Sequence, residues 1–439
     1  MNNGMQMRRR IPELRSDAAW FDDAKLGIMY SWGLYSVPGW APTDPRLVEH
    51  FAGRTQSLES PWAHMSPLAT SSYAEWYQNS MNLVGSPTWF YHQARWAGRT
   101  YESFRQEFEA ATESVDLSSW AELARAAGAK YLLPLAKHHD GYLLYPSEVS
   151  SPYRHGFHSP RDVIGELKSH TIAAGLRFGV YYSGGLDWTA AGLPIAHNED
   201  MLGDREARTE RFWPERYARL ANAHLREVID RYEPAVLWND IGYPDRGDAR
   251  GIIAHLRSVV PDAVVNDRFD HEDYDFDSPE YKPNFDSDRK WELCRGIGMS
   301  FGYNRNEGSE HALTGREAID LLISVVSRGG NLLFGVGPDD TGAISAEQQR
   351  PLRELGSWLD INGAAIYDTA PLADPPQIAD VRFTATTERV FALTERSRID
   401  LDLGVSQVRA LDPRIRAHLT EGTLVIDNPT GAVAAIELS

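Results

Sequence analysis

Short apolar runs alternate with longer helical patterns over residues 20–367, and this alternation limits the possible folds more than any other feature. Alternation of this kind is typical of parallel β-strands joined by crossover helices. We expect strands at 26–32, 130–136, 176–183, 235–240, 263–269, 295–303 and 331–338. Helices are predicted at 119–129, 161–175, near 206–232, and at 251–260, 314–329 and 345–363. Thr314 is the expected N-cap and Gly329 the expected C-cap of the helix at 314–329.

The number of strand–helix units distinguishes between two parallel architectures. About seven or eight units in roughly 350 residues fit a (β/α)8 barrel better than an open doubly wound sheet. No Gly-x-Gly-x-x-Gly motif follows the first strand, which argues against a dinucleotide-binding domain. Past residue 370 the pattern changes to short alternating strands separated by turn residues. We therefore predict an α/β fold with an N-terminal extension (1–20), a catalytic (β/α)8-like TIM barrel (21–370) and a small C-terminal β-sandwich (371–439).

Charge and cysteine content exclude several classes of function. Asp and Glu (62) outnumber Lys and Arg (44), and a chain with a formal net charge of −18 is repelled by nucleic acid and anionic lipid. The single cysteine, Cys294, rules out an internal disulfide and a multi-cysteine metal site. No signal peptide or membrane span is recognisable in the sequence. We expect a cytoplasmic protein without nucleic-acid or membrane partners. A monomer and a homo-oligomer are both compatible with the sequence.

The carboxyl ends of the predicted strands indicate where chemistry would take place, because active-site residues gather at that end of a TIM barrel. Aromatic, imidazole, guanidinium and carboxylate groups occur there, on Ser31–Trp32, His138–His139–Asp140, Tyr181, Trp238, Asp240 and Arg268. Glu75, Trp76 and the acidic stretch 271–281 lie between strands. Aromatic rings can cover the apolar faces of a sugar, polar groups can bind its hydroxyls, and paired carboxylates can perform acetal chemistry. The combination therefore favours a sugar site.

Some of these residues also have simpler interpretations. His138 and His139 could bind a metal, but adjacent residues of a strand point in opposite directions, so we expect no metal site. We expect no organic cofactor either. Asp240 could cap an Asx turn or a helix, and Arg268 could pair with a carboxylate of the barrel.

Several segments match a known family in order along the chain. They are KLGIMYSWGLYSVPGWAP (25–42), YAEWYQNS (73–80), AGAKYLLPLAKHHDGYLLYPS (127–147), GLRFGVYYSGGLDW (175–188), VLWNDIGYP (236–244), NDRF (266–269), RGIGMSFGYNRNE (295–307) and GGNLLFGVGP (329–338). KHHDG and LWND on successive strands are the most specific of them. On these segments the chain resembles the retaining α-L-fucosidases of glycoside hydrolase family 29. The family fold, a (β/α)8-like barrel with a C-terminal β-sandwich, agrees with the pattern described above.

The resemblance implies roles for individual residues. Asp240 would be the nucleophile, and Glu280 the general acid/base, in the hydrolysis of a fucosylated glycan or glycoside with retention. Residues that would line the fucose pocket are Ser31, Glu75, Trp76, His138, His139, Tyr181, Trp238 and Arg268. The acid/base lies in a loop that varies within the family, and rival carboxylates there are Glu272, Asp273, Asp275, Asp277 and Asp286. Acidic neighbours and burial would favour the protonated form that a general acid needs.

One position departs from the family pattern. Ser31 stands where the family's first strand ends in a histidine that hydrogen-bonds a ring hydroxyl of fucose. A first alternative is therefore a relative retuned to another deoxy sugar. A second alternative is a catalytically inactive sugar-binding protein, although a lectin would not need both Asp240 and Glu280. A metal-dependent barrel hydrolase is a more distant alternative.

Overall fold

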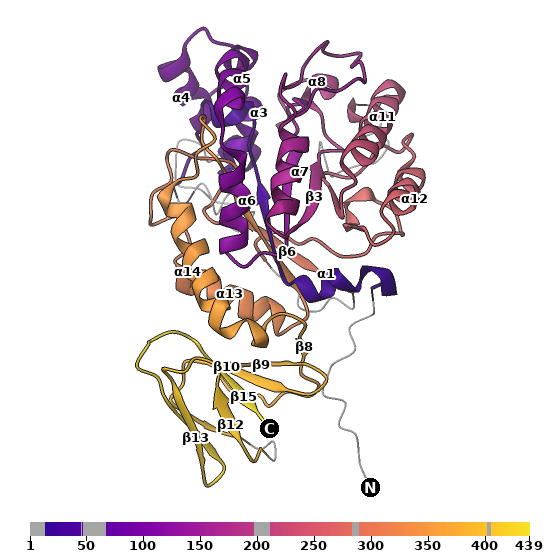
Figure 1. Ribbon diagram of the computed structural model, residues 1–439. Coiled ribbons are helices and arrows are strands. Elements are labelled where there is room, and N and C mark those ends of the chain that lie inside the picture. The colour runs from indigo at the N-terminus through magenta and orange to yellow at the C-terminus, as the bar shows by residue number, and fades with distance from the viewer. Residues whose placement is uncertain (1–13, 45, 47–66, 197–210, 283–288, 402–404) are drawn as a thin grey trace.

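β1 (Leu26–Tyr30) lies inside a parallel sheet of seven strands, in the spatial order β5–β4–β3–β2–β1–β7–β6 (Figure 1). The computed structural model describes residues 14–44, 46, 67–196, 211–282, 289–401 and 405–439. The other strands of this sheet are β2 (Tyr131–Lys137), β3 (Arg177–Tyr182), β4 (Val236–Asn239), β5 (Val264–Val265), β6 (Glu292–Gly296) and β7 (Asn331–Val336). β1 pairs in parallel with β2 on one side and with β7 on the other, which brings Gly27 opposite both Tyr131 and Leu333.

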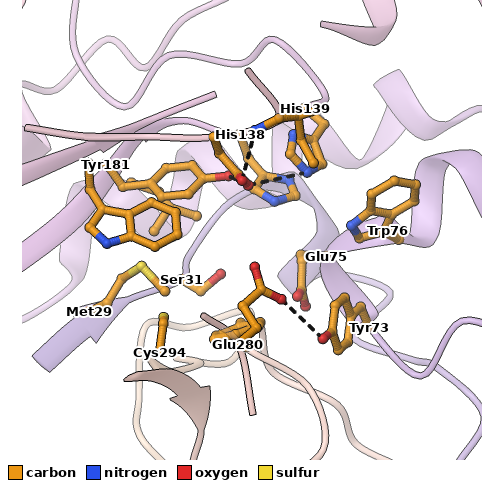
Figure 2. Close-up of a pocket in the computed structure, with 15 residues that line it drawn as sticks. Met29, Ser31, Tyr73, Glu75, Trp76, His138, His139, Tyr181, Glu280 and Cys294 are labelled. Carbon is orange, nitrogen blue, oxygen red and sulfur yellow. Dashed lines mark hydrogen bonds and ion pairs between the residues drawn. The ribbon is translucent and has the colours of Figure 1, made fainter. Parts of the chain in front are cut away.

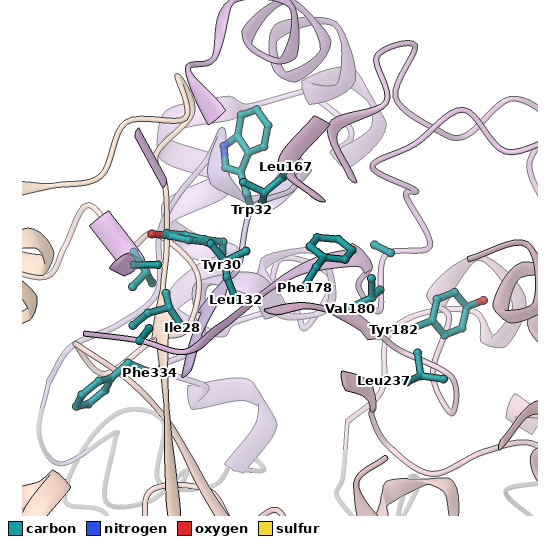
Figure 3. Close-up of a cluster of buried hydrophobic side chains, with 14 of the residues drawn as sticks. Ile28, Tyr30, Trp32, Leu132, Leu167, Phe178, Val180, Tyr182, Leu237 and Phe334 are labelled. Carbon is teal, nitrogen blue, oxygen red and sulfur yellow. The ribbon is translucent and has the colours of Figure 1, made fainter. Parts of the chain in front are cut away.

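The strands are apolar without interruption because both faces of the sheet are buried. One face of β1 directs Ile28 and Tyr30 toward the surrounding helices, in the buried cluster of Figure 3. The opposite face directs Met29 into the barrel, where it packs with Leu133 of β2 and Leu333 of β7. The sheet therefore has a helix-covered outside and a separate apolar interior.

A short irregular segment occupies the eighth position of the barrel. Residues 275–281 lie between β5 and β6 and form parallel bridges to both sides, pairing Asn266 with Phe276, Asp277 with Trp291 and Glu280 with Cys294. Backbone bonds support these bridges, for example from Cys294 N to Pro279 O at 2.9 Å. The segment therefore closes the ring between β5 and β6, and it places Glu280 in the barrel wall.

Helices cover the outside of the barrel (Figure 1). Those that follow strands are α6 (Leu117–Ala126), α7 (Val163–Ala173), α11 (Glu215–Tyr232), α12 (Ala249–Val259), α13 (Gly315–Val326) and α14 (Ala346–Asn362). All six overlap predicted helices; the predicted residues 206–210 lie outside the described part of the chain. Thr314 caps α13 in a capping box with Glu317. Gly329 lies two residues beyond the C-cap Ser327, with a φ of +89°.

The sequence-based prediction of the barrel was wrong at one strand and omitted two helices. A strand was expected at 295–303, but the strand in this region, β6, begins at Glu292 and ends at Gly296. Residues 297–303 form a loop. Two helices between β1 and β2 were not predicted from the sequence, α4 (Pro87–Trp96) and α5 (Arg105–Ser114). No helix in the described part of the chain is both long and apolar enough to span a membrane.

The C-terminal region consists of two antiparallel sheets that face a common apolar core. A five-stranded sheet has the order β12–β15–β10–β9–β8, and a three-stranded sheet has the order β11–β14–β13. The strands are β8 (Ala370–Pro371), β9 (Val381–Ala385), β10 (Val390–Thr394), β11 (Arg398–Asp400), β12 (Val408–Ala410), β13 (Arg416–Thr420), β14 (Thr423–Asp427) and β15 (Ala434–Leu438). Phe383, Leu424 and Ile436 belong to their shared core. Trp358 of α14 donates from Nε1 to Val433 O at 2.9 Å, which ties the barrel to this region.

Candidate active site

A pocket of about 500 Å³, with the open solvent at its mouth included, lies at the carboxyl ends of the barrel strands (Figure 2). It is lined by Met29, Ser31, Tyr73, Glu75, Trp76, Leu135, His138, His139, Tyr181, Trp238, Asp240, Ile241, Glu280, Cys294 and Phe301. All the predicted site residues except Arg268 line this one pocket. Arg268 lies behind the lining and contacts Asp240 and Glu280, which belong to it. Every lining residue belongs to the barrel, and none of the described residues of the C-terminal sheets is among them.

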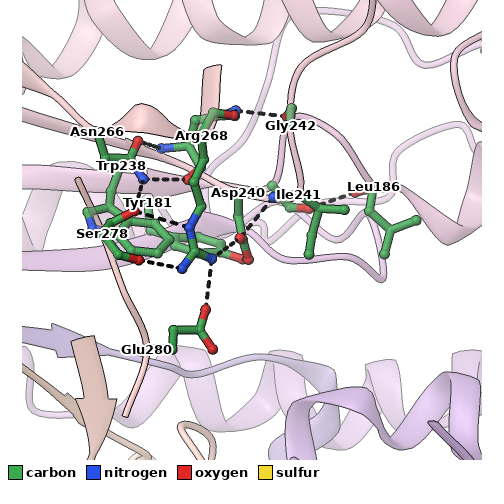
Figure 4. A network of polar contacts seen from close by, with 12 residues as sticks. Tyr181, Leu186, Trp238, Asp240, Ile241, Gly242, Asn266, Arg268, Ser278 and Glu280 are labelled. Carbon is green, nitrogen blue, oxygen red and sulfur yellow. Dashed lines mark hydrogen bonds and ion pairs between the residues drawn. The ribbon is translucent and has the colours of Figure 1, made fainter. Parts of the chain in front are cut away.

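Two carboxylates face each other across Arg268 (Figure 4). Asp240, one residue beyond β4, accepts from Arg268 Nη1 through Oδ1 at 2.5 Å. Glu280 Oε1 lies 2.7 Å from the same nitrogen. The two oxygens are therefore no further apart than these two distances together, an upper limit that is compatible with the carboxyl spacing of about 5–5.5 Å found in retaining glycosidases.

Arg268 is fixed by contacts on each side of its guanidinium. Nε donates to Ser278 Oγ at 3.1 Å and Nη2 donates to Ser278 O at 2.8 Å. Its plane lies over the Trp238 ring, with Cζ 4.5 Å from the ring centroid. Burial opposes the charge of Arg268, but the carboxylates of Glu280 and Asp240 outweigh burial and raise the pKa of the guanidinium. The cation in contact with Glu280 differs from the acidic surroundings expected from the sequence.

Asp240 also receives bonds from a tyrosine and from the backbone. Tyr181 on β3 donates to Oδ2 at 2.6 Å, and Ile241 N donates to Oδ1 at 2.8 Å. Hydrogen bonds to a carboxylate are short and strong, and they fix its orientation. Asp240 is therefore an oriented side chain in the pocket wall, held by more bonds than an Asx turn requires.

His138 and His139 both line the pocket because β2 ends at Lys137 and the alternation of a strand no longer applies to them. Their ring centroids are 3.9 Å apart. Burial lowers the pKa of both imidazoles well below its usual value, so both rings are neutral. No group of three metal-ligating side chains is present among the described residues.

The tautomer of His139 follows from its neighbour. Ser183 Oγ has one proton, and it donates that proton to Leu186 O at 2.7 Å. It must therefore accept from His139 Nδ1, 2.6 Å away. The other nitrogen, Nε2, lies 3.8 Å from Asp240 Oδ2 and carries no proton in the neutral ring. His139 can thus accept a hydrogen bond from a ligand hydroxyl.

Glu75 and Trp76 come from a single 3-10 turn, η4 (Ala74–Trp76). Glu75 is 2% exposed, and its Oε2 accepts from Ser300 Oγ at 3.0 Å and from Gly302 N at 2.9 Å. Burial raises the pKa of the Glu75 carboxyl to about 7. The loop that was expected to be a strand thus holds a pocket carboxylate that titrates near neutral pH.

Ser31 lies directly after β1, and its side chain faces the pocket. Its Oγ is 3.1 Å from the Tyr35 hydroxyl, and the residue is 1% exposed. The side chain therefore belongs to the pocket wall, and its hydroxyl bonds another side chain instead of capping the strand.

The rival carboxylates of the acidic stretch lie elsewhere. Asp275 pairs with Arg15 and Arg257, each at 3.1 Å. Glu272 and Asp273 are exposed, and neither they nor Asp277 line the pocket. Asp286 lies outside the described residues. Of the described carboxylates in 271–281, Glu280 alone lines the pocket.

Several pocket residues were not predicted from the sequence. Tyr73 lies 3.4 Å from Glu280 Oε2 through its hydroxyl and belongs to the same matched segment as Glu75, so that segment could have identified it. Met29, Leu135 and Cys294 point into the barrel from strands, and inward alternation along those strands was the available signal. Phe301 was hidden by the incorrect strand at 295–303.

Comparisons with known proteins agree with this geometry. The family model described as alpha-L-fucosidase matches residues 6–364. Human plasma alpha-L-fucosidase is 32% identical over 372 residues, which is 81% of this chain and 70% of its own. A Thermotoga maritima alpha-fucosidase structure in complex with a mechanism-based inhibitor has a TM-score of 0.80 at 36% identity, covering 96% of each chain. The complex of a Thermotoga maritima alpha-fucosidase with fucose has a TM-score of 0.80 at 35% identity, covering 98% of this chain and all of the other.

These matches extend over most of the chain and include both the barrel and the segments that form the pocket. The family prediction and the predicted barrel with a C-terminal β domain are confirmed. The protein is a glycoside hydrolase that belongs to the α-L-fucosidase family.

Proposed function

We propose that this protein hydrolyses terminal α-L-fucosyl residues with retention of configuration, with Asp240 as nucleophile and Glu280 as general acid/base. The substrate class is supported by the family and by the fucose complex of the Thermotoga maritima relative. The retaining mechanism is supported by the carboxylate pair, and this pair is the observation that carries the proposal.

In the first step the fucosyl ring occupies the pocket with its anomeric carbon between the two carboxylates. Asp240 attacks that carbon while Glu280 gives a proton to the departing glycosidic oxygen, which leaves a fucosyl ester on Asp240. Tyr181 and Arg268, which donate to Asp240 at 2.6 and 2.5 Å, hold the carboxylate in place for this attack. In the second step Glu280 takes a proton from water while the water oxygen attacks the anomeric carbon, which breaks the ester bond, frees the Asp240 carboxylate and releases fucose.

The neutral rings of His138 and His139 and the carboxylate of Glu75 are placed to bind hydroxyls of the sugar. Trp76 and Trp238 supply aromatic surface in the same pocket. Residues of these types fix the orientation of a ring whose reacting carbon must be placed to within a fraction of an ångström.

The test is hydrolysis of an aryl α-L-fucoside followed by proton NMR of the sugar released. Initial formation of α-L-fucose supports the proposal. Initial formation of β-L-fucose would show inversion and would remove the nucleophile role from Asp240. Unchanged turnover after treatment with a chelator distinguishes this mechanism from a metal-dependent hydrolase. Binding of fucose without any turnover would instead support the inactive sugar-binding protein.

A second candidate function is supported by Ser31. Its short side chain lies at the pocket wall where the family histidine is expected, so the space beside the sugar differs from that in the family pattern. A related deoxy sugar with another substituent at C4 or C5 would use that space. A panel of aryl glycosides that differ at C4 and C5 tests this candidate, and higher kcat/KM on a sugar other than fucose would establish it.

A further inference from the structure

One buried carboxylate of the barrel interior takes no part in the proposed mechanism. Glu292 on β6 is 0% exposed. Its Oε1 accepts from Trp238 Nε1 at 3.1 Å, and its Oε2 accepts from the Tyr131 hydroxyl. Burial raises the pKa of the Glu292 carboxyl to about 7. A buried carboxylate is costly compared with an apolar residue, so a barrel core gains no stability from placing one here.

The contact with Trp238 links Glu292 to the nucleophile. The Trp238 indole stacks on Tyr181, with the ring centroids 5.5 Å apart and the planes 21° from parallel. The guanidinium of Arg268 lies over the same indole at 4.5 Å. Among the described residues, Tyr181 and Arg268 are the two side chains that donate to Asp240. Both donors to the nucleophile therefore pack against a ring whose only polar atom is held by Glu292.

We infer that Glu292 is a positioning residue, which fixes the Trp238 indole and through it the two donors that orient Asp240. The inference rests on the proposed role of Asp240 as nucleophile. The hydrogen bond to Nε1 determines how the indole is turned, because torsion about the bond to an aromatic ring is otherwise broad. Displacement of the ring moves the Tyr181 hydroxyl and the Arg268 guanidinium relative to Asp240. Small displacements of reacting groups cause large losses of rate.

Tyr131 provides the matched control. It bonds the other oxygen of Glu292 and has no place in the pocket wall. Tyr131→Phe therefore removes one hydrogen bond of Glu292 and leaves the bond to Trp238. If Glu292 serves only the stability of the core, loss of either bond should affect the enzyme in the same way.

The experiment measures kcat, KM and melting temperature for Glu292→Gln, Glu292→Met and Tyr131→Phe, with an aryl α-L-fucoside as substrate. Gln keeps an oxygen that accepts from Trp238, so we expect its kcat to stay within about threefold of the wild-type value. Met fills a similar volume and offers only a weakly accepting thioether in place of the oxygen, so kcat of this variant should fall by about tenfold or more with a smaller change in KM. Tyr131→Phe should lower the melting temperature without a comparable fall in kcat.

A double variant tests the route through the indole. Trp238→Phe removes the N–H donor and keeps an aromatic ring, so adding Glu292→Met to it should cost little further activity. Fully additive losses would overturn the inference, as would a Glu292→Met enzyme with more than half of the wild-type kcat. If Glu292→Met does not fold, the single variant Trp238→Phe tests the inference, because an unchanged kcat in Trp238→Phe also overturns the inference.

Failure of the proposed function is recognised separately, because it shows in the wild-type enzyme. If the glycoside panel identifies a preferred sugar other than fucose, the ratio of kcat between each variant and the wild type is measured on that sugar. The inference then stands or falls on the ratios between variants and not on the identity of the substrate.

Discussion

Asp240 and Glu280 both contact one nitrogen, Nη1 of Arg268, which donates a hydrogen bond to Asp240 Oδ1 at 2.5 Å and forms an ion pair with Glu280 Oε1 at 2.7 Å. Arg268 is in turn bonded to both the side chain and the backbone of Ser278. Ser278 lies two residues before Glu280 in the segment that closes the barrel. One guanidinium therefore ties Asp240, the proposed nucleophile one residue beyond β4, to the barrel segment that carries Glu280, the proposed acid/base. The spacing of the two carboxylates is therefore set by the barrel wall and does not depend on a distant loop.

Replacing Asp240 by Gly should abolish covalent catalysis and leave the fold intact, because the side chain faces the pocket. We expect kcat on an aryl α-L-fucoside to fall by several orders of magnitude, and added azide to restore part of it by occupying the vacated space. Asp140→Asn is a matched control, since Asp140 also follows a strand but bonds Tyr101 and lies outside the pocket wall. More than about a tenth of wild-type activity in the glycine variant, a loss of under about 1.4 kcal/mol, would contradict the assignment.

Replacing Glu280 by Ala should affect substrates according to their leaving group. Aryl fucosides whose leaving group needs no proton should lose much less activity than alkyl fucosides or fucosylated glycans, and the alkaline limb of the pH–rate profile should flatten. Glu272→Ala is the control, because Glu272 is an exposed carboxylate of the same stretch and does not line the pocket. Equal losses on all leaving groups would assign Glu280 a binding role.

Ser31→His should change sugar preference, because an imidazole in this position reaches further into the pocket than the serine hydroxyl. We expect kcat/KM for an aryl α-L-fucoside to improve by up to the value of one hydrogen bond, about 0.5–1.5 kcal/mol. Any preferred sugar other than fucose should be hydrolysed less well. Ser31→Ala is the control, since it removes the bond to Tyr35 without filling the space. Unchanged kinetics on every glycoside of the panel would show that position 31 does not set specificity.

Glu75 should make the free energy of unfolding depend on pH. Burial raises the pKa of its carboxyl from 4.5 to about 7, so between these values the folded state binds more protons than the unfolded state. The contribution of Glu75 to the free energy of unfolding is therefore fully present below about pH 4.5. It is lost as the pH rises to about 7, by at most about 1.4 kcal/mol per pH unit.

Glu75→Gln isolates this contribution. Its amide oxygen can replace Oε2, which accepts both bonds from Ser300 and Gly302. Urea unfolding at pH 5, 6, 7 and 8 should show that the stability difference between the variant and the wild type increases up to about pH 7 and is constant above it. Parallel curves over this range would show that Glu75 is ionised throughout.

The sequence predicted the regular part of the barrel well, because strands buried on both faces are marked by uninterrupted apolar residues. β1, β2, β3 and β7 all lie within the predicted ranges or next to them. The strand at 295–303 was misplaced because its apolar residues belong to a loop packed under the pocket, where Phe301 lines the cavity. β6 instead begins at Glu292, a charged residue that does not indicate a buried strand.

Most residues that line the pocket could be named from the sequence, but the hydrogen bonds and contacts between them could not. Strand ends and matched segments identified Asp240, Glu280 and the histidines. The acidic stretch 271–281 gave no sign that it completes the barrel, because its alternating carboxylates are typical of a solvated loop. The bridging role of Arg268 and the contact of Glu292 with Trp238 each join residues that the sequence keeps apart, so only the fold shows them.

The pairing of β1 with β7 also bears on how the enzyme is made. One edge of β1 pairs with β2, whose residues come about a hundred positions later in the sequence. The other edge pairs with β7 much further along the chain, with Gly27 opposite Leu333. On the ribosome, the first strand must therefore keep one edge unpaired until nearly the whole barrel sequence has been translated. Open strand edges of this kind are sites of misassembly during synthesis. A chain released before β7 would contain Asp240 and Glu280 and still lack a closed barrel to hold them.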